Sequence, residues 1–170
     1  MKSDLKGKQR FFFFYRKESP FSQFHSSKFS VDDKEFSCAE QYMMYSKAVL
    51  FNDEVMKKAI LKTSNPAEMK KCGRRVKDFD ADVWNKHCVD IVRTGNEAKF
   101  SQNETLKEQL FQTYPKTLAE ASPMDRIWGI GLSEKNELAW DSKTWRGKNL
   151  LGYTLTEVRD KLMKDEDLID

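Results

Sequence analysis

From Ala39 to Phe111 the apolar residues of this chain recur every three or four positions, between residues that typically start or stop helices. This spacing is typical of helices that bury one face in a protein core. Asn65-Pro66 and Asp80 are strong helix-start signals, because they offer a capping side chain and, at Pro66, a preset helical φ. The predicted helices run over 39–51, 54–63 and 66–76, from the Asp80 cap to an interruption near Gly95, from the Asn103 cap through Phe111, and over 149–163.

Two other segments are predicted to form short β-structure. Phe11 to Tyr15 is aromatic on both alternating faces, which predicts a buried central strand. Residues 28–38 contain Asp32-Asp33 between short alternating runs, which predicts a hairpin or an irregular β-segment. The fold class is therefore mainly α, in the sense of α+β with a few short strands. We expect one compact multihelical domain over residues 11–163, between a flexible N-terminus (1–10) and an acidic, flexible C-terminus (164–170).

The composition fits a single soluble globular domain. The 170 residues are 39% hydrophobic, which is enough for a single well-covered domain and short for two. Charged residues make up 34% of the chain, and the formal net charge of +3 is spread along it. Interspersed charges argue against a basic nucleic-acid arm, although the small positive excess favours anionic ligands such as phosphate esters.

The cysteines and histidines predict neither a metal site nor a disulfide framework. Cys38, Cys72 and Cys88 are widely spaced, and His25 and His87 are the only histidines. Cys72 and Cys88 fall in apolar periodic stretches, so we expect reduced core thiols and a reducing compartment. No stretch resembles a signal peptide or a membrane span. We therefore predict a cytosolic or nuclear protein with no metal, no cofactor and no membrane partner.

The segment Ser122 to Leu132 joins chemically useful side chains to glycines. Asp125 is suited to proton transfer, and Arg126 to phosphate binding. Trp128 is suited to stacking on a base or sugar, and Gly129 and Gly131 allow close backbone approach to a ligand. Two interpretations stay open from these residues alone. One is a ligand site, and the other is a tight turn that leads into a buried strand with Trp128 in the core.

Glu40 begins a predicted helix among apolar neighbours, and Lys47 lies seven residues later on the same face. The helix N-terminus favours the carboxylate, whereas an apolar setting raises its pKa. The pair is either part of a reactive site or a solvent-facing acid and base on an amphipathic helix.

Other candidate ligand residues each have an ordinary structural alternative. Arg16, Arg74 and Lys99 are phosphate candidates or exposed surface charges. Trp84 is a stacking residue or a core residue. Asn149 caps the last helix, whose N-terminal amides are also suited to phosphate. The common phosphate-loop, dinucleotide-binding, esterase and zinc-protease motifs are missing from the sequence.

Several uncommon motifs occur together in a defined order. They are Pro20-Phe21-Ser22-Gln23-Phe24, Ala39 to Ala48, Gly73-Arg74, Trp84, Lys99-Phe100, Leu118 to Ser122, Asp125 to Gly131 and Gly147 to Gly152. In these motifs the chain closely resembles the YbiA-like, or NADAR, domain family from about Phe12 to Leu162. The chain departs from the family pattern at Gln41, where many members have histidine, and at Gln23, where some have asparagine.

The resemblance implies a mainly helical domain and a metal-independent N-glycosidase. The implied substrates are a phosphorylated ribosylamine of the riboflavin-biosynthesis type, or ADP-ribose attached to guanine in nucleic acid. A non-catalytic module that binds ADP-ribose or a related NAD-derived nucleotide is the alternative. The implied catalytic residues are Glu40, Asp125 and Lys47, where Lys47 is either a nucleophile or a phosphate ligand. The expected substrate-binding residues are Arg16, Ser22, Phe24, Arg74, Trp84, Lys99, Trp128, Gly129, Gly131 and Asn149.

Overall fold

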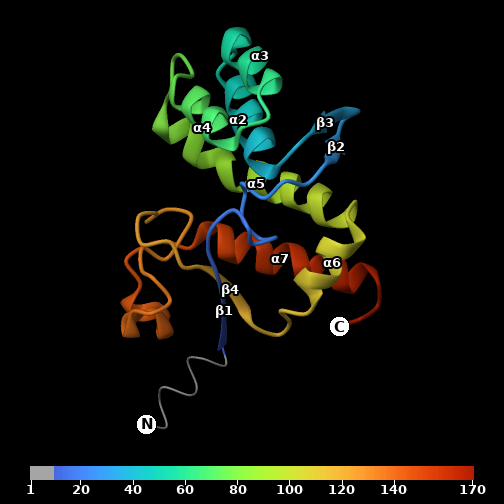
Figure 1. The fold of residues 1–170 in the computed structure, drawn as a ribbon, viewed down its shortest axis with the longest axis vertical. Helices are drawn as coiled ribbons and strands as arrows, with labels where there is room; N and C mark the ends of the chain where they lie inside the picture. The colour runs from blue at the N-terminus through green and yellow to red at the C-terminus, as the bar shows by residue number, and fades with distance from the viewer. Residues whose placement is uncertain (1–9) are drawn as a thin grey trace. The chain divides into compact units, whose positions relative to one another are not determined.

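The computed structural model describes residues 10–170, and its internal contacts divide the chain into two units (Figure 1). Gln23–Glu104 forms a helical unit. The segment up to Ser22 combines with Thr105–Asp170 into a second unit, which we call the strand unit because it contains the parallel strand pair. Among the described residues, no helix is both long and apolar enough to cross a membrane.

The helical unit contains β2, β3 and four helices. Their bounds are β2 Phe29–Val31, β3 Lys34–Phe36, α2 Ala39–Leu50, α3 Glu54–Lys62, α4 Pro66–Arg74 and α5 Ala81–Ser101. Helix α2 packs against α3, α4 and α5, so it lies at the centre of this unit. Asp53, Asn65 and Asp80 cap the following helices by accepting backbone N–H groups, which confirms the two predicted start signals.

The predicted hairpin is confirmed as the antiparallel pair β2 and β3. Asp32 and Asp33 form its two-residue turn with φ angles of 50° and 62°. Positive φ at both central positions matches the right-handed twist of the strands, and aspartate tolerates this conformation better than most residues.

The predicted interruption near Gly95 is wrong, because α5 runs without a break from Ala81 to Ser101. Gly95 instead makes room for a neighbouring helix. A Cβ atom at this position would lie 2.6 Å from Cδ1 of Tyr42 on α2. A missing side chain therefore explains this glycine, and the helical backbone tolerates it at a modest energetic cost.

In the strand unit, β1 Phe11–Phe14 pairs in parallel with β4 Thr117–Glu120. The prediction of a central strand is wrong, because in the described part of the chain β1 pairs with one strand only, β4. Aromatic side chains pack against both faces of β1. Phe12 and Phe14 meet Phe21 edge-on, while Phe13 meets Trp140 with ring centroids 4.8 Å apart. β4 itself was not predicted.

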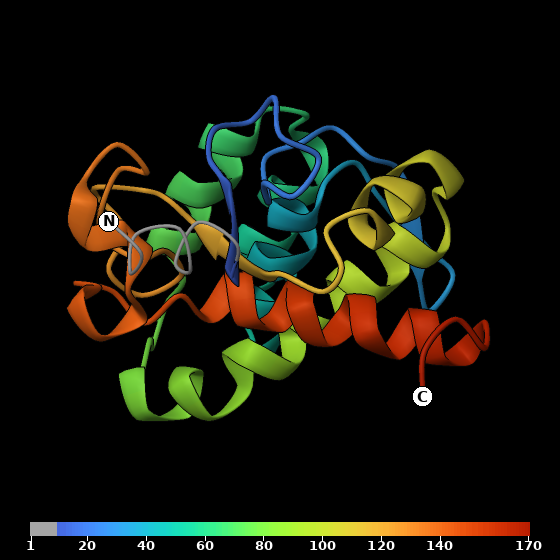
Figure 2. The ribbon, with the colours of Figure 1, turned by 90° about the horizontal axis from the view of Figure 1, so that it is seen from below.

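Helix α7, Leu150–Asp165, lies along β4, and the shorter α6, Glu104–Phe111, precedes the strand (Figure 2). The last helix extends two residues beyond its predicted end. Its final turn closes where the Leu168 N–H donates to the Met163 carbonyl, with Asp167 at a φ of 57°. Of the two cysteines expected in the core, Cys88 is buried and Cys72 is half-buried. The predicted flexible N-terminus (1–10) lies almost entirely outside the described residues.

Candidate active site

Glu40 is buried at the start of α2, with 6% of its surface exposed. Its backbone N–H donates to the Gln23 carbonyl at 2.9 Å, which holds this turn in place. The first turn of a helix stabilises a carboxylate through the partial positive charge of its free N–H groups. The solvent-facing alternative for this acid is therefore wrong.

Lys47 lies further along α2 and is half-buried. Burial lowers the pKa of this ammonium, and the nearby Arg74 charge lowers it further, whereas the Glu40 carboxylate raises it. Glu40 and Arg74 therefore both lie close enough to act on the Lys47 charge, and we call these three residues the Lys47 cluster. A lysine with a lowered pKa carries a larger fraction of neutral, nucleophilic amine near neutral pH.

Two aromatic rings face the Lys47 ammonium. Its Nζ lies 4.5 Å from the Phe79 ring centroid and 5.5 Å from the Trp84 ring. Trp84 is half-buried on α5, so its ring does not lie wholly in the core. Phe79 was missed by the sequence reasoning. The available signal was a lone aromatic residue in a loop, next to the Asp80 cap.

Lys99 is fully buried on α5. Burial lowers its pKa to about 7, and negative charge on the neighbouring Cys38 sulfur partly opposes this shift. The ammonium also lies 4.9 Å from the Phe100 ring. Burial raises the pKa of Cys38, and interaction with Glu40 adds to that increase. Cys38 therefore interacts electrostatically with both Glu40 and Lys99.

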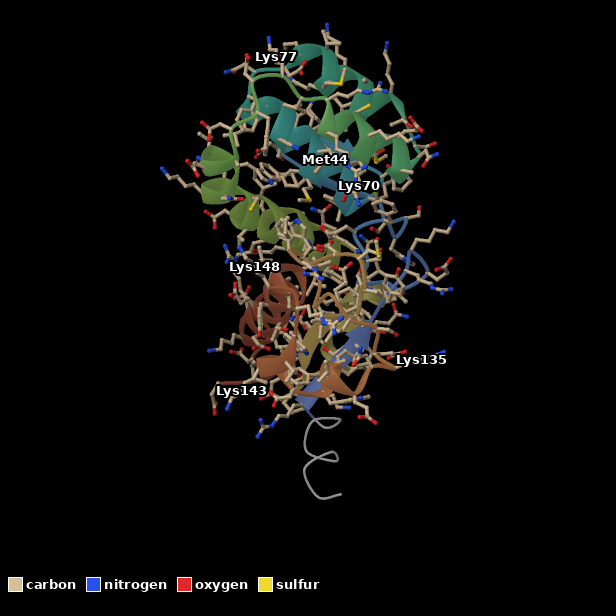
Figure 3. All side chains as sticks on the ribbon, turned by 90° about the vertical axis from the view of Figure 1, so that its left-hand side faces the viewer. Met44, Lys70, Lys77, Lys135, Lys143 and Lys148 are labelled. Carbon is tan, nitrogen blue, oxygen red and sulfur yellow. The ribbon has the colours of Figure 1, made fainter. Side chains whose placement is uncertain are left out.

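Gly73 and Arg74 end α4 in different environments. Gly73 is buried against Met44, since a Cβ would lie 2.0 Å from the Met44 Sδ, and Arg74 is exposed. Met44 lies inside the helical unit, whereas Lys77 lies at its outer surface (Figure 3). Phe24, also in this unit, is half-buried.

In the strand unit, the Asp125 carboxylate organises its own loop. Its Oδ1 accepts hydrogen bonds from the N–H groups of Ile127 at 2.9 Å and Trp128 at 2.8 Å. This is an Asx turn, in which the side chain replaces a backbone acceptor. Asp125 and Trp128 are both half-buried, whereas Arg126 is exposed. The predicted tight turn is therefore confirmed, but the buried strand expected after it is wrong, because Gly129 to Leu132 form no strand and Trp128 does not lie wholly in the core.

The Asp125 loop is bonded to the start of α7. The N–H groups of Leu150 and Leu151 donate to the carbonyls of Ile127 and Trp128 at 3.2 and 3.1 Å. Protein carbonyls therefore occupy the first two amides of α7, which corrects the expectation that these amides face a phosphate. Gly129 and Gly131 are buried among protein atoms, and Gly131 has a φ of 71°. Packing accounts for both glycines, and their predicted role in substrate binding remains a prediction.

Asn149 precedes α7 in a left-handed conformation, with a φ of 52°, and makes no side-chain cap. The capping prediction is wrong because the amide is used elsewhere. Its Nδ2 donates to the Leu118 carbonyl at 3.1 Å, and its Oδ1 accepts the Glu120 N–H at 3.0 Å. Asn149 is fully buried, and these two hydrogen bonds connect the start of α7 to β4.

Arg16 and Ser22 lie elsewhere in the strand unit. Arg16 is exposed with a φ of 72°, and it lines an open cavity of about 870 Å³ together with Lys135 and the rings of β1. Ser22 is half-buried, and its N–H donates to the Ser19 carbonyl at 3.1 Å.

The predicted site residues thus fall into two groups. The helical unit brings together Glu40, Lys47, Arg74 and Trp84 beside the buried Lys99, while the strand unit holds Arg16, Ser22, the Asp125 loop and Asn149. Residues 12–163 match the sequence model of the family described as the NADAR domain. The chain belongs to the NADAR domain family.

Individual relatives agree with this membership. N-glycosidase R617 of Acanthamoeba polyphaga mimivirus is 46% identical over 127 residues, 75% of this chain and 75% of the viral protein. Protein irg-1 of Caenorhabditis elegans is 38% identical over 168 residues, covering 89% of this chain and 79% of its own length. N-glycosidase YbiA of Escherichia coli is 32% identical over 142 residues, 84% of this chain and 80% of YbiA.

The NMR structure of the E. coli protein YbiA matches this NADAR domain with a TM-score of 0.77 and 28% identity. The match covers 95% of this chain and 90% of the YbiA chain. The expected fold class, mainly helical with a few short strands, is confirmed.

The two departures from the family pattern have structural roles in this NADAR domain. The Gln41 amide donates to the carbonyls of Ile60 and Thr63 and accepts from the N–H and hydroxyl of Ser37. Gln23 exchanges hydrogen bonds with the buried Asn96 amide, at 3.1 and 3.3 Å. Gln41 directly follows Glu40, and the Gln23 carbonyl accepts the Glu40 N–H, so the side-chain hydrogen bonds of both glutamines fix the backbone next to Glu40. Across residues 10–170, no group of three or more histidine, cysteine or acidic side chains is arranged to hold a metal.

Proposed function

We propose that this NADAR domain is an N-glycosidase that cleaves the bond between a ribosyl anomeric carbon and a base nitrogen. The observation that carries the proposal is the half-buried Lys47 amine, which lies 4.5 Å from the Phe79 ring centroid and interacts electrostatically with the buried Glu40 carboxylate. The relatives named N-glycosidase support the same reaction class. The proposed substrates are a phosphorylated ribosylamine of the riboflavin-biosynthesis type and ADP-ribose attached to guanine.

Glu40 is proposed to stabilise positive charge at the anomeric carbon. Cleavage of an N-glycoside develops oxocarbenium character, and a buried carboxylate interacts strongly with such a charge. The same carboxylate is proposed to accept a proton from Lys47 or from water. The proposed chemistry uses a carboxylate and an amine. We therefore expect the protein to keep its activity in excess EDTA.

Lys47 is proposed to act as a nucleophile. Its neutral amine attacks the anomeric carbon, a carbon–nitrogen bond forms, and the bond to the base breaks while the base nitrogen takes up a proton. The second amine proton passes to the ring oxygen as the ring opens, which gives a Schiff base that water hydrolyses to the free sugar and the free lysine. Overall, one water is consumed and one base is released.

The remaining residues are proposed to bind the substrate. Arg74, beside Lys47, and Arg16, in the cavity of the strand unit, are proposed phosphate ligands. Lys99 is proposed to bind phosphate or to support Glu40 electrostatically through their shared neighbour Cys38. Asp125 is proposed to hold a ribose hydroxyl or a water, and Trp128 to flank the base or sugar. Ser22, Phe24, Gly129, Gly131 and Asn149 remain proposed substrate-binding residues.

The test is turnover combined with reductive trapping. The purified protein is incubated with a ribosylaminopyrimidine phosphate and, separately, with ADP-ribosylated guanine in DNA, and base release is followed by chromatography. Borohydride is then added to reduce the Schiff base, and the labelled lysine is identified by mass spectrometry. We expect base release from at least one substrate and a sugar adduct on Lys47.

Three variants sharpen this test. Glu40→Gln is expected to lower kcat by at least about a hundredfold. Lys47→Arg keeps the charge and is expected to abolish the adduct. Lys58→Arg, at an exposed lysine of α3, serves as the matched control and should behave as wild type. Retained ADP-ribose binding without turnover of either substrate would contradict the enzyme proposal and support the non-catalytic module.

A further inference from the structure

Phe79 lies outside the helices, immediately before the Asp80 cap of α5, and 48% of its surface is exposed. The Phe51 ring, at the C-terminal end of α2, supports it at a centroid distance of 5.5 Å with an interplanar angle of 58°. A large apolar ring that is packed on one neighbour and half open to solvent is well placed to bind a ligand.

The reaction itself brings a planar group to this ring. In the proposed mechanism, the attacking nitrogen of Lys47 and the departing nitrogen of the base share one carbon atom. The base departs on the side of this carbon opposite Nζ, so it lies one carbon atom away from an amine that is 4.5 Å from the Phe79 centroid and 5.5 Å from the Trp84 ring.

We infer that Phe79 and Trp84 form a stacking platform for the leaving base, with Phe79 as a specificity-determining residue. This inference rests on the proposed function with Lys47 as the nucleophile. The platform selects for a planar heteroaromatic leaving group, because both aminopyrimidines and guanine offer a π-face and stacking tolerates differences in ring substituents.

The platform also explains the position of the ammonium in the free protein. A cation over an aromatic face is attracted by the ring quadrupole, so the rings hold Lys47 in one place before substrate arrives. When the base enters, it stacks where the rings are open to solvent, and the amine is already directed at the adjacent carbon.

The experiment compares substitutions that keep or remove the ring face. Phe79→Leu retains an apolar side chain without a π-face, and Phe79→Trp restores one. Val55→Ala, at a 71% exposed apolar residue of the same unit, is the matched control. On whichever substrate the wild type turns over, we expect Phe79→Leu to lower kcat/KM by about ten- to a hundredfold, mainly through KM. Phe79→Trp should recover most of this loss.

A second readout does not require turnover. Saturation-transfer NMR with guanosine should show contact with the wild-type protein and a weaker signal with Phe79→Leu. Equal kcat/KM or equal guanosine signals for wild type and Phe79→Leu would overturn the platform. Absence of both turnover and a borohydride adduct in the wild type would instead overturn the proposed function, and the guanosine comparison would still decide for or against the platform.

Discussion

The Asn149 side chain pairs with the backbone at Leu118 as a neighbouring strand would. Its Nδ2 donates to the Leu118 carbonyl at 3.1 Å, while its Oδ1 accepts the N–H of Glu120, two residues along β4. One amide thus satisfies a donor and an acceptor on the edge of β4 that does not face β1. Thr156 continues the arrangement by accepting the Leu118 N–H at 3.0 Å. Helix α7 therefore closes the strand edge with side chains.

We expect Asn149→Ala to lower the free energy of unfolding by about 2–4 kcal/mol, because it leaves two buried backbone groups without partners. Denaturant unfolding measures this loss. Asn149→Gly is the control for backbone strain, since glycine adopts the φ of 52° easily but also lacks the amide. A glycine variant as stable as wild type would contradict the pairing role.

Gly147 lies where the Asp125 loop meets the start of α7. A Cβ there would lie 2.2 Å from the Gly129 carbonyl oxygen and 2.9 Å from the Arg126 Cα. Because both are backbone atoms, Gly147→Ala should lower the free energy of unfolding by about 2–3 kcal/mol. The control is Gly73→Ala, whose Cβ would meet only the side chain of Met44, 2.0 Å from Sδ and 3.1 Å from Cγ. Helix propensity partly offsets that clash, so we expect thermal and chemical unfolding within about 1 kcal/mol of wild type.

The buried Lys99 should make the free energy of unfolding depend on pH. Its pKa falls from 10.5 in a free side chain to about 7 in the folded protein. Between these values the unfolded chain binds the proton and the folded chain does not, so this group makes stability rise with pH. Below pH 7 both states are protonated, and the full cost of burying the charge is present.

We therefore expect the difference in unfolding free energy between Lys99→Met and wild type to fall as pH rises above 7. The slope should approach about 1.4 kcal/mol per pH unit, and the difference should level off below pH 7. Urea titrations at several pH values from 6 to 9 measure it. A difference that stays constant over this range would mean that Lys99 remains charged.

The reactivity of Lys47 should respond to its two charged neighbours in opposite directions. The Glu40 carboxylate raises the pKa of Lys47, so Glu40→Gln should lower it further and speed amine acylation at pH 7.5. Arg74 lowers the pKa of Lys47, so Arg74→Gln should slow acylation. Competitive labelling with mass spectrometry, with Lys58 as the internal reference, measures both effects. Changes of the same sign in the two variants would contradict the cluster.

Asp125 combines a structural and a proposed chemical role, and two substitutions separate them. Asp125→Asn keeps an Oδ1 acceptor for the N–H groups of Ile127 and Trp128, so the free energy of unfolding should change by less than about 1 kcal/mol. Asp125→Ala removes the acceptor and should cost about 1–2 kcal/mol. If the charge also holds substrate or water, Asp125→Asn should still lower kcat/KM. Wild-type kcat/KM in Asp125→Asn would show that only the turn matters.

Features that depend on neighbouring residues were predictable. The capped starts of α4 and α5 and the Asp32-Asp33 turn follow from hydrogen bonds and φ preferences that act within a few positions. The predicted helix interruption at Gly95 was wrong because a glycine inside a helix cannot be distinguished from a helix break until the packing partner is known. Here the partner is the Tyr42 ring, more than fifty residues earlier.

The sequence by itself determined the helical periodicity, the hairpin turn and the placement of Glu40 and Lys47 on one helix. The tertiary structure decided that β1 pairs with β4, that Asn149 fastens a strand edge and that Phe79 meets Lys47. These contacts join residues far apart in the chain. Local preferences do not select such contacts, because each is stable only when the surrounding core is packed and its buried polar groups are satisfied.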